Sequence, residues 1–271
     1  MRKLGMCVPI AFDGDLFGKM NFIRETGFDT CFFGWTLETD VYSLRRHAES
    51  IGLEVETLHA PFGKINSMWD ESSSEGDFFT EEIKKCIRDA GNNGIPYVVV
   101  HTSIGNNAPL SSRIGLTRFE KLVIEAEKRG VKLAFENLEY PRLMALVLDY
   151  FKCDTVGFCY DTGHENCFTP GLKFMPMFGD RLFCTHIHDN LSRNVEDVAN
   201  YRNDQHKIPF DGCIDFEAVC SDIKKSGYTG SLMLEATNRW DLNFYGDLGF
   251  EGFVKKSYEA AVTLRKLTDG E

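Results

Sequence analysis

A chain of 271 residues can form one (β/α)8 barrel or two small domains, because such barrels reach about 250 residues as single units. The 41 acidic and 30 basic side chains leave a net charge of −11, which repels the phosphate backbone of nucleic acids and weighs against them as partners. No stretch approaches the roughly 20 apolar residues of a spanning helix, and the nine cysteines form no Cys-x-x-Cys pair, so we expect a cytoplasmic protein with buried thiols and no membrane partner.

Short β-rich runs alternate with longer amphipathic runs along the whole chain, a pattern typical of repeated strand-helix units. Strands are predicted near residues 4–9, 30–35, 53–59, 97–101, 132–136, 156–161, 182–186 and 231–235. Helices are predicted near residues 14–26, 40–51, 79–93, 111–129, 141–152, 171–180, 215–226 and 252–267. No Pro-, Gly- or Ser-rich linker divides the eight units, so the sequence predicts an α/β fold in which residues 1–271 form a single (β/α)8 TIM barrel.

Two predicted connections are longer than a barrel needs. Residues 63–77 follow the third strand, and residues 191–213 follow the seventh. Long loops in a compact domain are usually functional or mobile, so we expect both loops to form the walls or lid of a pocket.

Histidines and carboxylates stand at or just past the ends of most predicted strands. They are His59, His101, Glu136, Asp161, His164, His186, His188, Asp204, His206 and Glu235. The carboxyl ends of parallel barrel strands meet at one rim, so these side chains should lie close together. Imidazoles and carboxylates gathered in this way indicate a divalent-metal site.

Taken one at a time, these residues have ordinary explanations. A glutamate that ends an apolar strand, such as Glu136 or Glu235, can be paired with an arginine instead of a metal, and a lone strand-end histidine is most often a satisfied core residue. In THIHDN, strand alternation sends His186 and His188 to the same side, and we expect His186 to be the ligand and His188 to contact a ligand or the substrate.

In chain order, the segments HAPF, VVVHTS, LAFENLEYP, YDTGH, THIHDN, DQHKIPFDGCID and LMLEATN resemble the xylose isomerase-like TIM barrels. This superfamily includes sugar phosphate isomerases and epimerases and the endonuclease IV type of abasic-site nuclease (AP endonuclease family 2). The resemblance runs from the third strand to the eighth. The chain departs from many relatives at residues 209–212, where Pro-Phe-Asp-Gly stands in place of Pro-Gly-x-Gly, and we expect the neighbouring loop wall to differ.

The epimerase branch implies one divalent ion, Mn, Zn, Co or Mg, held by Glu136, Asp161, His186 and Glu235, with both glutamates moving protons. The nuclease branch implies two to three zinc ions. Its ligands would be His59, His101, Glu136, Asp161, His164, His186, Asp204, His206 and Glu235.

We expect a metal-dependent isomerase or epimerase that acts on a small ketose, keto acid or keto-polyol through an enediolate. His164, His188 and Arg193 are candidates for binding the substrate, which would be a sugar or a sugar-derived molecule. The alternatives are a zinc-cluster phosphodiesterase acting at abasic sites and a keto-polyol dehydratase. The aromatic-rich segments 27–35 and 239–250 could form an interface between identical subunits or pack inside the barrel.

Overall fold

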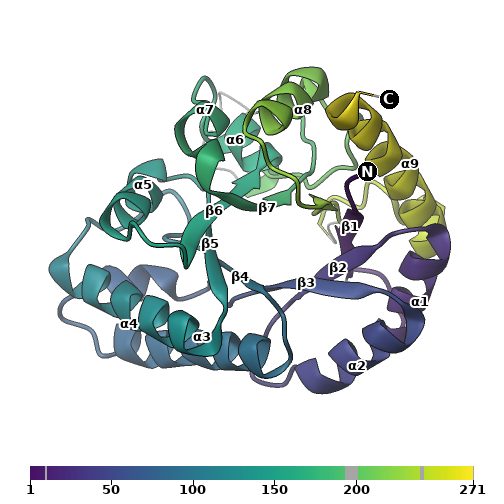
Figure 1. The fold of residues 1–271 in the computed structure, drawn as a ribbon. Coiled ribbons are helices and arrows are strands. Elements are labelled where there is room, and N and C mark those ends of the chain that lie inside the picture. The colour runs from purple at the N-terminus through teal and green to yellow at the C-terminus, as the bar shows by residue number, and fades with distance from the viewer. Residues whose placement is uncertain (10, 193–200, 239–240, 271) are drawn as a thin grey trace.

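The computed structural model describes residues 1–9, 11–192, 201–238 and 241–270, which form a ring of eight parallel strands surrounded by helices (Figure 1). The strands are β1 (Leu4–Cys7), β2 (Thr30–Gly34), β3 (Glu54–His59), β4 (Tyr97–Val100), β5 (Lys132–Glu136), β6 (Val156–Asp161), β7 (Leu182–His186) and β8 (Leu232–Leu234). From β1 to β7 each strand pairs with the next one in chain order, and β1 also pairs with β8. The predicted single (β/α)8 TIM barrel is therefore confirmed.

The last gap in the barrel, between β7 and β8, is bridged just beyond the end of β7. The Ile187 amide donates to the Met233 carbonyl at 2.8 Å, and the Glu235 amide donates to the Ile187 carbonyl at 3.0 Å. This bridge fixes Glu235 directly beside the chain that leaves His186.

The helices form the outer layer of the barrel (Figure 1). They are α1 (Leu16–Thr26), α2 (Val41–Ile51), α3 (Glu75–Asn92), α4 (Arg113–Arg129), α5 (Pro141–Tyr150), α6 (Thr162–Phe168), α7 (Met175–Phe178), α8 (Phe216–Lys225) and α9 (Gly249–Asp269). Four short 3-10 turns are η1 (Ile65–Trp69), η2 (Gly179–Arg181), η3 (Tyr201–Asn203) and η4 (Gly246–Leu248). In the described ranges, no helix combines the length and the apolar character that crossing a membrane requires.

One helix prediction was wrong in extent, and one helix was not predicted. The helix expected over 171–180 is confined to Met175–Phe178. Gly171 has a φ of +87°, which is not helical, and Pro176 lacks a backbone N–H and so fits only in the first turn of a helix. A helix that was not predicted, α6, follows β6 directly. The predicted loop 63–77 is also shorter than expected, since it contains η1 and the first turn of α3.

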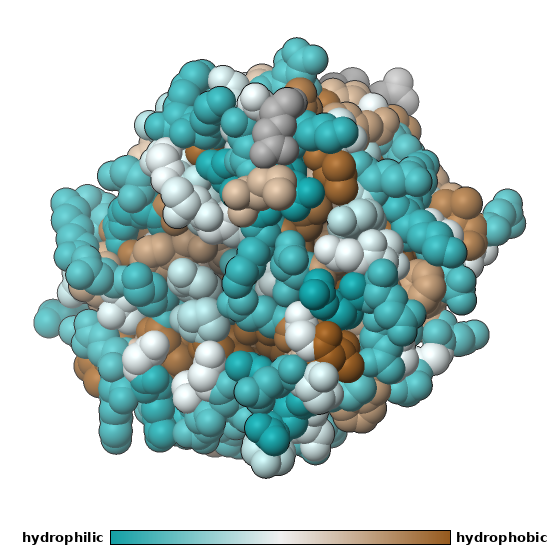
Figure 2. Space-filling model, turned by 45° about the vertical axis from the view of Figure 1, so that its right-hand side comes forward, coloured by the Kyte–Doolittle hydropathy of each residue, from teal (hydrophilic) through white to brown (hydrophobic). Residues whose placement is uncertain are grey.

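Apolar side chains fill both the barrel and the space between strands and helices. Val99, Ala134, Cys159 and Cys184 form a separate buried layer inside the strands. On the face shown in Figure 2, hydrophilic residues cover most of the surface and hydrophobic residues occur in separate small patches. The barrel interior therefore gives a rigid base to the polar residues at the strand ends.

A buried arginine holds the segment between β3 and α3 in place. Arg118 of α4 is only 2% exposed, and its guanidinium pairs with Asp77 at 3.1 Å. It also donates to four backbone oxygens, those of Ser67 (3.2 Å), Met68 (3.1 Å), Asp70 (2.7 Å) and Ser73 (2.9 Å). Because the Asp77 carboxylate and four carbonyl oxygens accept from the guanidinium, its charge is compensated although it is buried.

We expect Arg118→Met to lower the free energy of unfolding by about 3 kcal/mol, because it leaves several buried carbonyls without a donor. Chemical denaturation measures the change. Lys121→Met is the matched control, since Lys121 is half-exposed and pairs with the same Asp77 at 3.6 Å, and it should cost less than about 1 kcal/mol. Equal effects of the two changes would contradict the assigned role of Arg118.

Candidate metal centre

Four predicted ligands meet at the rim of the barrel. Glu136 ends β5, Asp161 ends β6, His186 ends β7 and Glu235 follows β8. Glu136, Asp161 and His186 have no exposed surface, and one ligand atom from each of the four residues lies within 4.8 Å of the other three. Ligand-to-metal distances of about 2.0–2.2 Å place ligand atoms at such separations, so this donor set fits a divalent ion.

His186 lies at the centre of this group. Its Nδ1 is 2.9 Å from Glu136 Oε1 and 3.3 Å from Glu235 Oε2, so one nitrogen faces two carboxylates. The ring stacks on Phe32 with centroids 4.7 Å apart, and Nε2 has no hydrogen-bond partner among the described residues. The imidazole is thus held by packing, with Nδ1 as the atom presented to the carboxylates.

His59 and His101 approach Glu136 from β3 and the end of β4. Their Nε2 atoms lie 3.4 and 3.0 Å from Glu136 Oε2. Phe62 stacks on the His101 ring at 4.5 Å. The structure therefore brings both predicted additional ligands to the carboxylate of Glu136.

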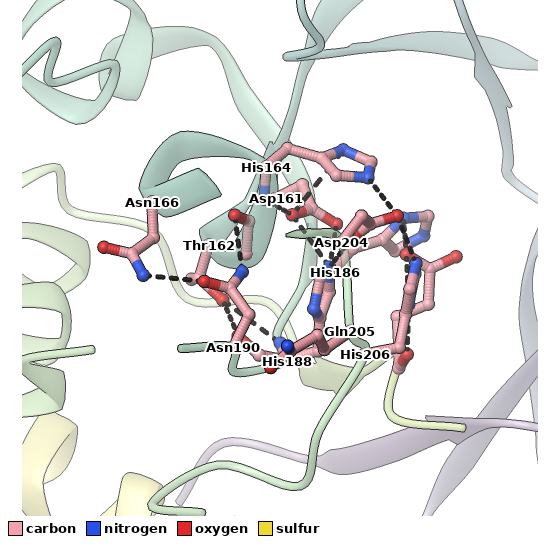
Figure 3. A network of polar contacts seen from close by, with 12 residues as sticks. Asp161, Thr162, His164, Asn166, His186, His188, Asn190, Asp204, Gln205 and His206 are labelled. Atoms are coloured by element: carbon pink, nitrogen blue, oxygen red, sulfur yellow. Dashed lines mark hydrogen bonds and ion pairs between the residues drawn. The ribbon is translucent and has the colours of Figure 1, made fainter. Parts of the chain in front are cut away.

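A third group forms around Asp204. Its Oδ2 is 2.9 Å from His206 Nε2 and 3.6 Å from His164 Nε2, and the His188 ring stacks on His206 with centroids 4.0 Å apart. Figure 3 shows these side chains turned toward one another, with Asp161 between His164 and His188. The loop after β7 thus brings Asp204 and His206 onto the rim.

Three histidines share one bonding pattern. His59, His164 and His206 each place Nδ1 against a backbone carbonyl, those of Ala60 (2.8 Å), Asn137 (3.1 Å) and Glu235 (2.9 Å). An imidazole that donates through Nδ1 carries its lone pair on Nε2 when neutral, and in each case Nε2 faces a carboxylate. A cation must lie between two such acceptors, and metal-bound histidines are typically oriented by a carbonyl in this way.

The short distances between imidazoles and carboxylates shift the pKa values of both kinds of group. Burial by itself raises the pKa of Glu136, but the neighbouring His186 and His101 hold it well below the usual range. Burial likewise opposes the charged form of His206, and the adjacent Asp204 carboxylate raises its pKa to about 9. Glu136 is therefore ionised at neutral pH.

Backbone contacts of Asp189 fix the loop that carries Asp204 and His206. Asp189 and Lys207 exchange two backbone hydrogen bonds of 2.8 Å. The Asp189 carboxylate accepts from the amides of Phe210, Gly212, Cys213 and Ile214 at 2.8–3.2 Å. A Cβ on Gly212 would lie 2.2 Å from Asp189 Oδ1, so only glycine allows this approach.

Phe210 occupies the position of the missing first glycine of the Pro-Gly-x-Gly turn. Its φ is +75°, a conformation that glycine adopts without strain and phenylalanine rarely adopts. The side chain is 46% exposed and packs on Phe216 with centroids 5.0 Å apart. The expected difference of the loop wall is thus an aromatic side chain on a left-handed turn.

Sequence reasoning missed Asn137, which orients a predicted ligand. The Asn137 side chain exchanges two 2.8 Å hydrogen bonds with the backbone of Asp161, tying β5 to β6. His188 has no exposed surface, and its Nε2 lies 3.1 Å from the Asp161 carboxylate, so it orients this carboxylate from behind. Its predicted substrate contact stays a prediction, and Arg193 lies outside the described residues.

The family model of the xylose isomerase-like TIM barrels matches residues 20–256. The chain belongs to this family. It is 28% identical over 264 residues to the uncharacterized protein y4fM of Sinorhizobium fredii, covering 83% of this chain and 82% of that one.

Solved xylose isomerase-like barrels share the fold at low sequence identity. The D-psicose 3-epimerase of Clostridium cellulolyticum, solved with D-tagatose, superposes with a TM-score of 0.78 at 13% identity and 98% and 99% coverage of the two chains. The IolI protein, solved with a zinc atom, gives a TM-score of 0.78 at 16% identity and 96% and 98% coverage. At this level of identity, the neighbours show that the fold is shared.

We expect Gly163→Ala to weaken divalent-metal binding at least about tenfold, because a Cβ there would lie 1.9 Å from the His188 ring and push it off Asp161. Calorimetric titration of the metal-free protein with Mn²⁺ measures the affinity. Gly63→Ala is the matched control, since its Cβ would meet nothing within 4 Å. Unchanged affinity in both variants would show that His188 does not position a ligand.

Proposed function

We propose that this protein is a divalent-metal-dependent isomerase or epimerase acting on a small ketose, keto acid or keto-polyol. The observation that carries the proposal is the approach of two carboxylates, Glu136 and Glu235, to the same nitrogen of His186 in a buried site. Glu136, Asp161, His186 and Glu235 would hold one ion, Mn, Zn, Co or Mg. The epimerases among the structural neighbours support the reaction class.

The chemistry requires a proton to leave the carbon beside a carbonyl and return to the same or the adjacent carbon. A divalent ion in this site would supply an electrophile for neighbouring carbonyl and hydroxyl oxygens, which stabilises the enediolate. Glu136 and Glu235 are both held ionised by His186, so either carboxylate can accept the proton. The other carboxylate, or exchange with solvent, returns it.

Substrate would reach these glutamates through a pocket of about 430 Å³. Glu136 and Glu235 both line it, together with His164 and the ring of Phe62. Apolar side chains beside ionised carboxylates exclude bulk water and strengthen the interactions of the site. A keto-polyol dehydratase would begin with the same proton abstraction, so the assay below includes loss of water.

We expect Glu136→Gln and Glu235→Gln each to lower turnover by about 10²- to 10⁴-fold, because each removes a proton acceptor. The measurement is incorporation of solvent deuterium into a panel of ketoses, with products analysed for epimers, isomers and dehydrated compounds. Glu56→Gln is a matched buried control, since Glu56 of β3 hydrogen-bonds Ser231 away from the site. Near-normal exchange in either site variant would contradict the two-glutamate mechanism.

A zinc-cluster phosphodiesterase is the second candidate. The three carbonyl-oriented histidines and the group around Asp204 favour it, because they offer ligands for further ions. The residues described along the 430 Å³ pocket include no lysine or arginine, although gripping a DNA backbone normally requires several. This absence of positive charge makes the isomerase the preferred function.

The metal content separates the two candidates. We expect elemental mass spectrometry to find about one metal ion per chain in protein purified without chelators. Asp204→Asn should leave that one ion in place, because Asp204 is outside the central group of four ligands. Two or three zinc ions, with one lost in Asp204→Asn, would instead support the phosphodiesterase.

A further inference from the structure

A large apolar chamber lies beside the candidate metal centre. It has a volume of about 950 Å³ and is lined by residues at the ends of β2 and β3 and at the starts of α1 and α2. His59, Phe62 and Glu235 line both this chamber and the 430 Å³ pocket. The two spaces are therefore adjacent at the edge of the metal centre.

Aromatic rings dominate the walls of the chamber. Phe17 and Phe62 are each 40% exposed, while Phe32 and Trp35 are buried with one face toward the chamber. The Trp35 indole nitrogen already donates to Asp89 at 2.8 Å, so this ring offers apolar surface only. Such a surface binds aryl or branched alkyl groups, which gain free energy by leaving water.

The charges around the chamber are negative. Asp15, Glu38 and Asp40 line it, and the described lining residues of both spaces include no lysine or arginine. Free backbone amides at a helix start can bind a phosphate. At the starts of α1 and α2, however, the Gly18 amide donates to Asp15 at 2.9 Å and the Ser43 amide donates to Asp40 at 3.0 Å. A phosphorylated group has no favourable position here.

We propose that the chamber binds an aryl or branched alkyl substituent of an uncharged, non-phosphorylated polyhydroxy substrate whose polar end reaches the metal centre. This inference rests on the proposed function for the polar end. The chamber volume lies at the upper end of the roughly 300–1,000 Å³ of small-molecule sites, so it accommodates a substituent in addition to a sugar-sized group. The substrate class is therefore a substituted sugar that also carries a carbonyl group, such as a keto-glycoside.

Binding of matched glucosides to the Mn²⁺-loaded full chain tests this inference by calorimetry. We expect phenyl β-D-glucopyranoside to bind at least about tenfold more tightly than methyl β-D-glucopyranoside, because the phenyl ring buries more apolar surface. Phe17→Ala should reduce this ratio to about threefold or less. Phe78→Ala, which removes a ring that is 74% exposed and outside the chamber, should leave the ratio unchanged.

Glucose and glucose 6-phosphate form the second pair of probes. We expect glucose 6-phosphate to bind no more tightly than glucose. Equal affinities for the two glucosides, or a preference for the phosphate, would overturn the inference even if ketoses exchange deuterium. A phenyl preference lost in Phe17→Ala would support it even if no ketose exchanges, so the chamber and the proposed reaction can fail separately.

Discussion

The close approach of three carboxylates, two of them fully buried, to one histidine is the constraint on which the rest of the rim depends. Within the described residues, the ion pairs of Glu136, Asp161 and Glu235 are all with histidines. Removing each carboxylate from water costs several kcal/mol unless a cation compensates it. A barrel tolerates this cost at its carboxyl rim because the layers below are apolar and fixed. The free energy of folding therefore depends on positive charge beside these carboxylates.

Among the described residues, no lysine or arginine holds these predicted ligands in place. Asn137 joins the backbone of β6 to that of β5, and His188 supports the Asp161 carboxylate. Asp189 gathers the amides of the following loop, which places Asp204 and His206 beside His188. This arrangement keeps the orienting groups from competing with a metal for its ligands, since a nearby ammonium or guanidinium would neutralise the carboxylates itself.

The sequence was sufficient to predict the barrel and the gathering of the strand-end residues, because both follow from periodicity and from the parallel direction of the strands. It could not predict that Asn137 and Asp189 act through backbone contacts, since asparagine and aspartate next to a strand end are also ordinary turn residues. The extent of α7 was wrong because apolar residues near 171–180 gave a helical pattern that Gly171 and Pro176 interrupt. The chamber could not be predicted from the sequence, because residues from α1, α2, β2 and β3 form its walls together.

Charge balance explains why the central group needs an ion more than the group around Asp204 does. The central group has three carboxylates and one imidazole. One proton on His186 would leave it with two negative charges, which a divalent cation would compensate. The outer group has one carboxylate and three imidazoles, so a single proton makes it neutral. The rise of the His206 pKa to about 9 beside Asp204 agrees with a proton held there at neutral pH. A proton can therefore complete the outer group, and its histidines remain compatible with a single-metal isomerase.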